Sequence, residues 1–246
     1  MAMSKPDIII NKTMDRADLL EDGIPAIRRS LDKFARKLFF EGIPFSVNGY
    51  LRWNYHIGWY KLWEYARGFK YCGIEKGMKV LDVGGAATVP VFYAAARGCS
   101  VYSVDIDEKL VRHTKKASKK KGWNIHAACI NLCEGELPED WDGFDVAVSF
   151  CVIEHINEEG RQKLLKKIGE RLKPGGVMAI TFDYGQNAPT QSPLRSVNDI
   201  KRIISQTGLG LCGNAEFADN SKLYMLGHAS RARYTFGSIF LRKVAG

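Results

Sequence analysis

The 246-residue sequence predicts a doubly wound α/β fold, in which helices cover both faces of a mostly parallel sheet. Three observations predict it. Near-continuous apolar runs alternate with helix-like segments from Gly77 onward, a glycine or proline closes each helix-like segment, and a glycine turn follows the first apolar run. Strands that are buried on both faces give such unbroken apolar runs, and parallel strands need crossover helices between them. The composition, 46% hydrophobic and 26% charged, supports a buried core and argues against wholesale disorder.

Two helices are expected before the sheet. Residues 13–42 place apolar side chains at helical spacing, and a glycine and a proline near residue 44 end the run. The aromatic segment YLRWNYHIGWYKLWEYARGF, residues 50–69, also predicts a helix. Five side chains would share much of one face of it: Trp53, His56, Trp59, Tyr60 and Trp63. Such a stripe is more often core packing than a ligand-binding surface, although its position just before the first strand also fits a lid.

The chain is therefore expected to divide near residue 72. Residues 1–72 would form an N-terminal helical cap or lid, and residues 73–246 would form the α/β domain. Five strand-like runs open that domain: MKVLDV, SVYSVDI, NIHAACI, FDVAVSF and VMAITFD. Helices are expected between them at 90–97, 108–121 and 158–172, with glycines at the left-handed position that follows each.

The pattern becomes looser after Asp183. The polar loop YGQNAPTQSP leads to a helix in which Ser196 and Asp199 form a capping box, and Gly208 ends it. Two more strands follow, the last of them YTFGSIFLRK. We expect a terminal hairpin at the edge of the sheet.

The net charge of +9 fits nucleic acid, an anionic surface or an anionic substrate and does not choose among them. The basic run HTKKASKKKGW, residues 113–123, including His113, is interpreted as a solvated helix face rather than a nucleic-acid stripe. No C-x-x-C pair occurs among the six cysteines, and His126, Cys129 and Cys133 lack a fourth ligand, so we expect reduced thiols and no metal. The start, MAMSKPDIII, is not a signal peptide pattern, and no apolar window is long enough for a membrane span. A cytoplasmic location is the expectation.

Ligands in open α/β sheets bind beyond the carboxyl ends of the strands. That rule selects four segments here, residues 82–88, 105–107, 131–132 and 150–155. Asp105 ends the second strand, where a carboxylate can accept hydrogen bonds from both hydroxyls of a ribose. A dinucleotide would need glycine at Ala86 and Val89, and Asp82 would repel a pyrophosphate. An acid beside the turn suits a cationic cofactor better, which favours S-adenosylmethionine.

Five segments then resemble one family in their order and spacing. VLDVGGAAT, VYSVDID, INLCEGELP, FDVAVSFCVIEHI and LKPGGVMAITFD are similar to the class I S-adenosylmethionine-dependent methyltransferases, in particular the type 11 and type 12 domains. The resemblance covers about residues 76–183 and implies a Rossmann-like, seven-stranded sheet whose last strand is antiparallel. It implies that the cofactor is bound by Asp82, Gly84, Gly85, Ala86, Asp105, Ile106, Asn131, Leu132 and Phe150. The turn departs from the family's glycine pattern at Ala86 and Thr88, and the methyl group of Ala86 is tolerated there only at negative φ.

The sequence indicates the methyl acceptor less sharply. His155 is the first candidate for a general base and could equally order its loop, and His56 is the second. Four residues are expected near the acceptor: Trp53, Trp59, Asp183 and Tyr184. We expect methyl transfer to an oxygen or nitrogen of a small molecule, for which the positive net charge leaves an anion as one option. The alternatives are an RNA methyltransferase that uses the basic surface and a cofactor-binding protein that has lost catalysis; the oligomeric state stays open.

Overall fold

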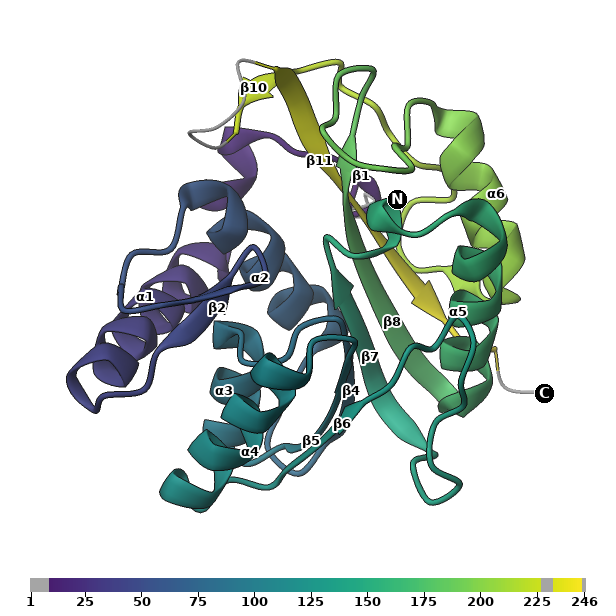
Figure 1. The fold of residues 1–246 in the computed structure, drawn as a ribbon. Coiled ribbons are helices and arrows are strands. Elements are labelled where there is room, and N and C mark those ends of the chain that lie inside the picture. The colour runs from purple at the N-terminus through teal and green to yellow at the C-terminus, as the bar shows by residue number, and fades with distance from the viewer. Residues whose placement is uncertain (1–8, 227–231, 245–246) are drawn as a thin grey trace, which may run out of the picture.

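A computed structural model describes residues 9–226 and 232–244 as a sheet between two helical layers (Figure 1). Most of the start segment MAMSKPDIII, its first eight residues, lies outside the described residues. The helices are the 3-10 turns η1 (Arg16–Leu20) and η2 (Ile153–His155), and α1 (Ile24–Phe40), α2 (Trp59–Cys72), α3 (Val89–Ala96), α4 (Glu108–Lys121), α5 (Glu158–Arg171) and α6 (Val197–Thr207). The strands are β1 (Lys12–Thr13), β2 (Phe45–Val47), β3 (Tyr50–Arg52), β4 (Lys79–Val83), β5 (Ser100–Asp105), β6 (Ile125–Cys129), β7 (Phe144–Phe150), β8 (Leu172–Tyr184), β9 (Gly210–Leu211), β10 (Tyr224–Met225) and β11 (Arg233–Arg242).

The main sheet has the order β1-β11-β8-β7-β4-β5-β6. Strands β8, β7, β4, β5 and β6 are parallel, and β11 runs antiparallel to β8. This confirms the doubly wound, mostly parallel sheet with an antiparallel last strand. Within the described residues it has nine strands rather than seven: the six longer strands, and the two-residue strands β1, β9 and β10, which all pair with β11.

Successive side chains on a strand point to opposite faces, and each face of this sheet has its own core. Val80 of β4 packs with residues of α1–α4 on one face, while the next residue, Leu81, packs with α5 and α6 on the other. Figure 1 shows the same division, with α1–α4 on one side of the sheet and α5 and α6 on the other. Within the described ranges, no helix is long and apolar enough to cross a membrane.

The expected helix over 13–42 is interrupted. Gly23 adopts φ 76° two residues before Pro25, so α1 starts only at Ile24, and the residues before it form β1 and a 3-10 turn. A capping box centred on Asp15 and Asp18 fixes that turn. The N-terminal segment therefore contributes an edge strand as well as helices.

The aromatic segment is only partly helical, which corrects the prediction of one stripe. Asn48 and Gly49 both have positive φ, 51° and 78°, and connect β2 to β3 in a tight hairpin. Helix α2 begins at Trp59, so Trp53 and His56 lie before it and share no helical face with the later aromatics. Trp63 is fully buried and donates a hydrogen bond to Asp18 Oδ2 at 2.8 Å. Its role is to anchor α2 to the N-terminal turn.

Candidate functional site

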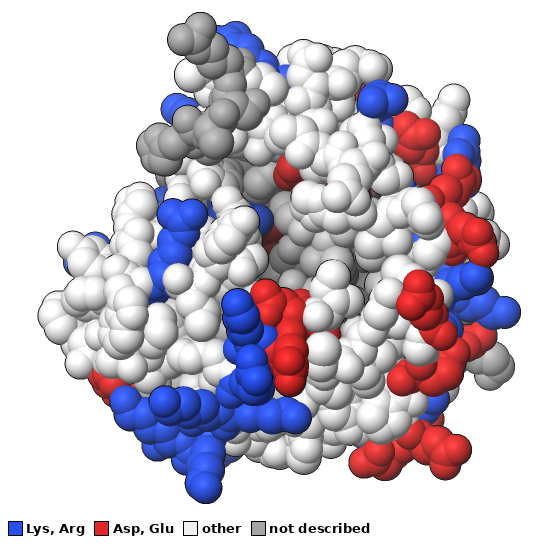
Figure 2. Space-filling view, in the orientation of Figure 1, with Lys and Arg blue, Asp and Glu red and all other residues white. Residues whose placement is uncertain are grey.

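A cavity of about 630 Å³ opens at the carboxyl ends of the central strands. Figure 2 shows that this face of the molecule is hollowed near its centre, with acidic side chains inside and beside the hollow. The walls come from the β2–β3 hairpin, α2, and the segments that follow β4, β5, β6, β7 and β8. Loops from strands that are far apart in the sequence therefore meet at one site, as expected for a doubly wound sheet.

The glycine turn after β4 is tight at two successive positions. Gly84 has φ 77°, and a Cβ there would lie 2.6 Å from a methyl group of Val152. A Cβ on Gly85 would lie 2.2 Å from Asp82 Oδ1, so this position also excludes a side chain. Both glycines are required by their surroundings, and Gly84 lines the cavity.

The third position of the turn does not need glycine. Ala86 has no positive φ, and the left-handed residue is its neighbour Ala87, with φ 62°. Ala86 is fully buried and its backbone N–H donates to Asp105 Oδ2 at 3.2 Å. Thr88 then caps α3 and donates through its hydroxyl to the Gly85 carbonyl at 2.6 Å. The departure from the glycine pattern thus leaves the turn intact, although it places a strained alanine at 87.

Asp82 supports the turn from below and does not line the cavity. Its carboxyl is 2% exposed and accepts a hydrogen bond from Ser103 Oγ at 2.7 Å. Burial raises the pKa of Asp82 to about 7, the Ser103 hydrogen bond opposes this, and the charge of Asp105 adds to it. The expected direct contact of Asp82 with a cofactor is therefore replaced by an indirect role through Gly85 and Ser103.

Asp105 and Ile106 form a polar and an apolar contact point side by side. Asp105 ends β5, lines the cavity, and accepts from the Asp107 backbone N–H at 2.9 Å as well as from Ala86. Each carboxylate oxygen retains a free lone pair for a hydroxyl group. The Ile106 side chain is 74% exposed at the cavity wall, where it offers an apolar surface to a ligand.

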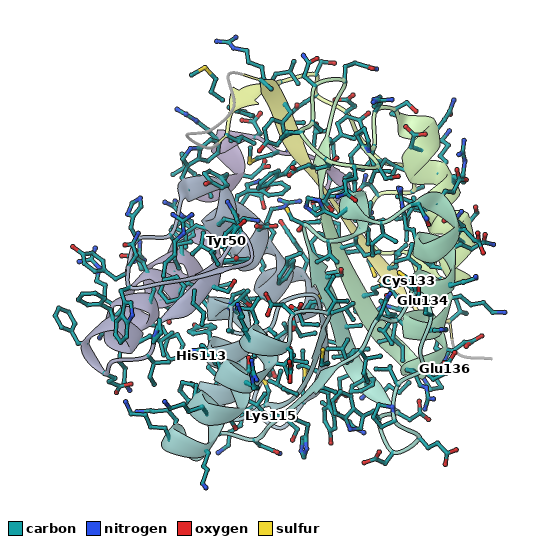
Figure 3. All side chains as sticks on the ribbon, in the orientation of Figure 1. Tyr50, His113, Lys115, Cys133, Glu134 and Glu136 are labelled. Atoms are coloured by element: carbon teal, nitrogen blue, oxygen red, sulfur yellow. The ribbon has the colours of Figure 1, made fainter. Side chains whose placement is uncertain are left out.

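The remaining residues expected at the cofactor also lie at the cavity. Asn131 is exposed, whereas Leu132 is 2% exposed, and both follow β6. Phe150 ends β7 and packs against α2 at Gly68, where a Cβ would lie 2.5 Å from the ring. Figure 3 shows the β6–β7 connection, marked by Cys133 and Glu134, on the opposite side of the opening from Tyr50 of the hairpin.

The residues expected at the acceptor are divided by the structure. His155 and Asp183 line the cavity, but Trp53, His56, Trp59 and Tyr184 do not. Trp53 is 67% exposed, and Trp59 packs on Tyr224 with the Arg16 guanidinium 4.6 Å above its ring. Tyr184 is buried and donates to Asp219 Oδ2 at 3.0 Å. The imidazole of His155 is exposed to the cavity, and burial with the charge of Lys61 lowers its pKa, so it is neutral at pH 7.

The sequence did not indicate the acidic cluster beside His155, formed by Lys61, Glu64, Cys151, Glu154 and Asp183. Lys61 Nζ lies 2.7 Å from Glu64 Oε1. The other oxygen of Glu64 accepts from Thr181 Oγ1 at 2.6 Å and from the Cys151 thiol at 3.1 Å. Glu154 Oε1 accepts from the Asp183 backbone N–H at 3.1 Å. Lys61 lies in the aromatic segment and Glu154 in the C-V-I-E-H segment, but nothing in the sequence predicts that these two segments lie side by side.

Electrostatics in the acidic cluster favour protons on two of its carboxyls. Burial and the charge of Asp183 raise the pKa of Glu154. Burial and the charge of Glu64 also raise the pKa of Asp183, although Lys61 opposes this shift. Burial would lower the pKa of the Lys61 ammonium, but its acidic neighbours, Glu64 among them, hold this pKa well above the usual value. These two carboxyls therefore exchange protons near neutral pH, unlike ordinary surface acids.

The other candidate features have structural explanations. His126 stacks on Tyr102 with ring centroids 4.6 Å apart, and Cys129 and Cys133 do not join it in a cluster of potential ligands within the described residues. In that part of the chain, the residues that could hold a metal ion are Cys151, Glu154 and Asp183. The prediction that His113 lies on a solvated helix face is wrong, because His113 is half-buried and its Nε2 lies 2.7 Å from the Pro44 carbonyl oxygen. Figure 3 places His113 and Lys115 together on α4, away from Cys133 and Glu134.

Known proteins are similar to this region in sequence and in fold. Residues 80–176 match the family model described as a methyltransferase domain. A ubiquinone biosynthesis O-methyltransferase of Coxiella burnetii is 30% identical over 101 residues, 41% of this chain and 42% of that protein. The tRNA N(3)-cytidine methyltransferase METTL2 of Danio rerio is 28% identical over 123 residues, 48% of this chain and 35% of that protein. The matches thus span less than half the length of these curated relatives.

A solved structure extends the similarity of fold along nearly the whole chain. The phosphoethanolamine N-methyltransferase 2 of Haemonchus contortus, in complex with S-adenosyl-L-methionine, superposes with a TM-score of 0.58 at 18% identity. The superposition covers 94% of this chain and 60% of that chain. At this identity the likeness shows a common fold.

Proposed function

Because the chain belongs to the class I S-adenosylmethionine-dependent methyltransferases, through its domain at residues 80–176 and its fold, we propose that it methylates a small molecule. The acceptor atom would be an oxygen or a nitrogen. One observation carries the proposal: a single cavity joins the Asp105 and Ile106 pair to the acidic cluster. A cofactor end and an acceptor end therefore face each other in one enclosed space.

The residues of the cavity fit S-adenosylmethionine. Asp105 offers carboxylate lone pairs to hydroxyl groups, and the exposed Ile106 offers an apolar surface to a flat ring. The missing Cβ atoms of Gly84 and Gly85 leave the turn close to the cavity without a side chain in the way. S-adenosylmethionine, when bound, supplies a methyl group already activated on a positively charged sulfur.

The protein's own contribution is then alignment and exclusion of water. Asp105 would fix the ribose end, while Phe150, held against α2 by Gly68, would limit the space beside it. Positioning of two reactants in this way supplies on the order of 7–11 kcal/mol of the barrier to a bimolecular reaction. The β2–β3 hairpin and α2 wall the other side of the cavity, which supports a capping role for residues 1–72.

An acceptor that carries a proton must lose it during transfer, and three groups at the cavity can accept it. His155 is neutral at pH 7, and the carboxyls of Glu154 and Asp183 have raised pKa values, to about 8 and about 7. A base whose pKa lies near the working pH is the most effective, adding about 10²–10⁴-fold to the rate. We infer that Glu154 and Asp183 share this task with, or take it from, His155.

Binding of S-adenosylmethionine to the full chain tests the proposal by calorimetry. We expect saturable binding, thermal stabilisation by the ligand, and about a 10- to 100-fold weaker affinity in Asp105→Asn. The matched control is Asp140→Asn, the same chemical change on the exposed β6–β7 connection, which should leave affinity unchanged. If the wild-type protein binds no S-adenosylmethionine, the proposal is wrong.

The net charge of +9 and the similarity to a tRNA methyltransferase favour RNA as the second candidate acceptor. Figure 2 shows lysines and arginines gathered over α4 and beside the hollow. Several of them are engaged locally: Lys120 donates to the Glu41 carbonyl at 2.8 Å, and Lys121 pairs with the Glu41 carboxylate at 3.0 Å. RNA binding whose affinity falls steeply as the salt concentration rises would favour this candidate. If RNA does not bind at any salt concentration, this candidate is excluded.

A further inference from the structure

The carboxylate pair, Glu154 and Asp183, is buried beside the cavity with too few donors for its oxygens. Glu154 is fully buried and its Oε2 has no hydrogen-bond partner among the described residues. Asp183 is 9% exposed and lines the cavity, and within the described part of the chain its carboxylate meets only the weak thiol donor of Cys151, at 3.9 Å. An unpaired buried carboxylate is expensive, so such a pair is normally completed by a cation or by a donor from a ligand.

The positive charge nearby is already engaged. Lys61 Nζ is 2.7 Å from Glu64 Oε1, and the second oxygen of Glu64 takes the Thr181 hydroxyl and the Cys151 thiol. The charges of Lys61 and Glu64 thus balance each other, and both oxygens of Glu64 have a close partner. Arg161 is directed elsewhere, because its Nη2 donates to Ser192 Oγ at 2.7 Å. The carboxylate pair is left as the negative, unsatisfied part of the acidic cluster.

Aromatic side chains surround the remaining space. Tyr60, Tyr65, Tyr234 and Phe236 line the same cavity as the carboxylate pair. Lys61 already illustrates how this wall receives an ammonium, since its Nζ lies 5.3 Å from the centre of the Phe236 ring. Ring faces attract organic cations, whereas a hydrated divalent ion needs oxygen ligands on several sides.

We propose that the carboxylate pair and the aromatic wall bind the protonated nitrogen of an amine, and that this nitrogen is the methyl acceptor. The ammonium would first pass one proton to a carboxylate of the pair. The freed lone pair would then form the N–C bond as the C–S bond of S-adenosylmethionine breaks, with S-adenosylhomocysteine as the leaving group. The inference rests on the proposed function and narrows its acceptor from oxygen or nitrogen to nitrogen. Ammonium hydrogens would fill the free positions on Glu154 Oε2 and Asp183, and the rings would cover the carbon substituents. The groups that face the pair are Lys61, Glu64, Tyr65, Cys151, His155, Arg161 and Tyr234.

Calorimetry of the full chain at pH 7.5, saturated with S-adenosylhomocysteine, tests this inference. The probes are phenethylamine and its uncharged isostere 2-phenylethanol. We expect the amine to bind at least about 10-fold more tightly, because a hydrogen bond that involves a charged group is stronger than one between neutral groups. Glu154→Gln and Asp183→Asn should each remove most of that preference. Glu159→Gln, an exposed acid on α5, is the matched control and should keep it.

Equal affinity for amine and alcohol, or binding of neither, overturns the inference. A metal-binding result also overturns the inference. If Mn²⁺ or Zn²⁺ alone binds, if Glu154→Gln abolishes this binding and if phenethylamine does not displace the ion, then Cys151, Glu154 and Asp183 form a metal site. Near-ultraviolet circular dichroism verifies that each variant folds. If neither variant folds, the comparison of the two probes on the wild-type protein still decides. If the wild-type protein does not bind S-adenosylhomocysteine, that result instead counts against the proposed function.

Discussion

Gly84 and Gly85 illustrate how single atoms decide whether the cofactor turn forms. Neither position tolerates a Cβ, but the reasons differ: the backbone of Gly84 is left-handed and faces Val152, while Gly85 faces the carboxyl of Asp82. The residue with the unfavourable backbone and a side chain is Ala87. Strain in this turn is therefore concentrated one residue away from where the glycine pattern is broken.

The two causes at Gly84 can be separated by a pair of variants. Gly84→Ala should lose about 1–2 kcal/mol for the left-handed backbone, plus the cost of the 2.6 Å contact with Val152. Gly84→Ala with Val152→Ala should recover the contact part only. Gly49→Ala is the control, since Gly49 has φ 78° with nothing within 4 Å of a Cβ. Urea denaturation measures all four proteins, and a Gly84→Ala loss no larger than that of Gly49→Ala would refute the steric part.

Asp82 makes stability depend on pH in a direction opposite to that of an ordinary salt-bridged acid. Its pKa is raised by burial from 3.8 to about 7, so its contribution is fully present below pH 3.8 and is lost as the pH rises through 7. Asp82→Asn keeps an acceptor for Ser103 and removes the ionisation. The variant should match the wild type near pH 4 and exceed it at pH 8, by on the order of a few kcal/mol.

Asp145 gives the opposite sign within the same fold. Burial opposes the shift, but Lys173 and the Lys79 backbone N–H outweigh it and lower the pKa of Asp145. Asp145→Asn should therefore lose stability at neutral pH and lose little in acid. Unfolding free energies measured from about pH 2 to 8 compare the two variants, because the contribution of Asp145 is lost only below pH 3.8, and parallel pH curves for both would contradict the assignment.

At the scale of elements, the N-terminal turn holds α2 in place. Asp18 is 4% exposed and accepts from Trp63 Nε1 at 2.8 Å, the Asp15 backbone N–H at 3.0 Å and Lys12 Nζ at 2.6 Å. A second link joins Arg67 Nη2 to the Ile10 carbonyl at 2.7 Å. Since Tyr65 and Gly68 of α2 shape the cavity, these remote contacts also position the site.

Removal of the Asp18 carboxyl should weaken this attachment. Asp18→Ala leaves the buried indole N–H of Trp63 without an acceptor, which costs about 1–3 kcal/mol in addition to the lost ion pair with Lys12. Asp18→Asn retains one acceptor and should lose less. Thermal unfolding ranks the three proteins, and an Asp18→Ala protein as stable as the wild type would show that α2 needs no such anchor.

Elements with a periodic pattern or a strong end signal could be predicted, and those without one could not. The helix predicted at 108–121 is α4 as observed, and the Ser196 and Asp199 capping box starts α6. The pair Asn48-Gly49 is a sequence signal for a β-hairpin turn, whereas the aromatic residues that follow it have the spacing of a helix. Strand β1 has only two residues, too few to show any alternation.

The same limit applied to the site. Residues of the strand ends, such as Asp105 and His155, could be predicted at the cavity because the fold class places all strand ends there. Lys61 and Glu64 are three residues apart on α2, so their pairing is local, but their position near Asp183 depends on how α2 lies on the sheet, which the sequence does not encode locally. The positions of Trp53, His56, Trp59 and Tyr184, which are predicted at the acceptor but do not line the cavity, depend on the same packing.

At the scale of the whole molecule, the sheet joins the two ends of the described chain. Lys12 and Thr13 pair with Ser238 and Gly237, so the outermost long strand has the beginning of the chain on one side and β8 on the other. Synthesis proceeds at about 5–20 residues per second. Between the synthesis of β1 and that of β11, the strand with which β1 pairs does not yet exist. The edge of β8 is equally bare until β11 emerges, and bare edges invite pairing between nascent chains. A ribosome stalled shortly before residue 233 would thus hold a product prone to aggregation.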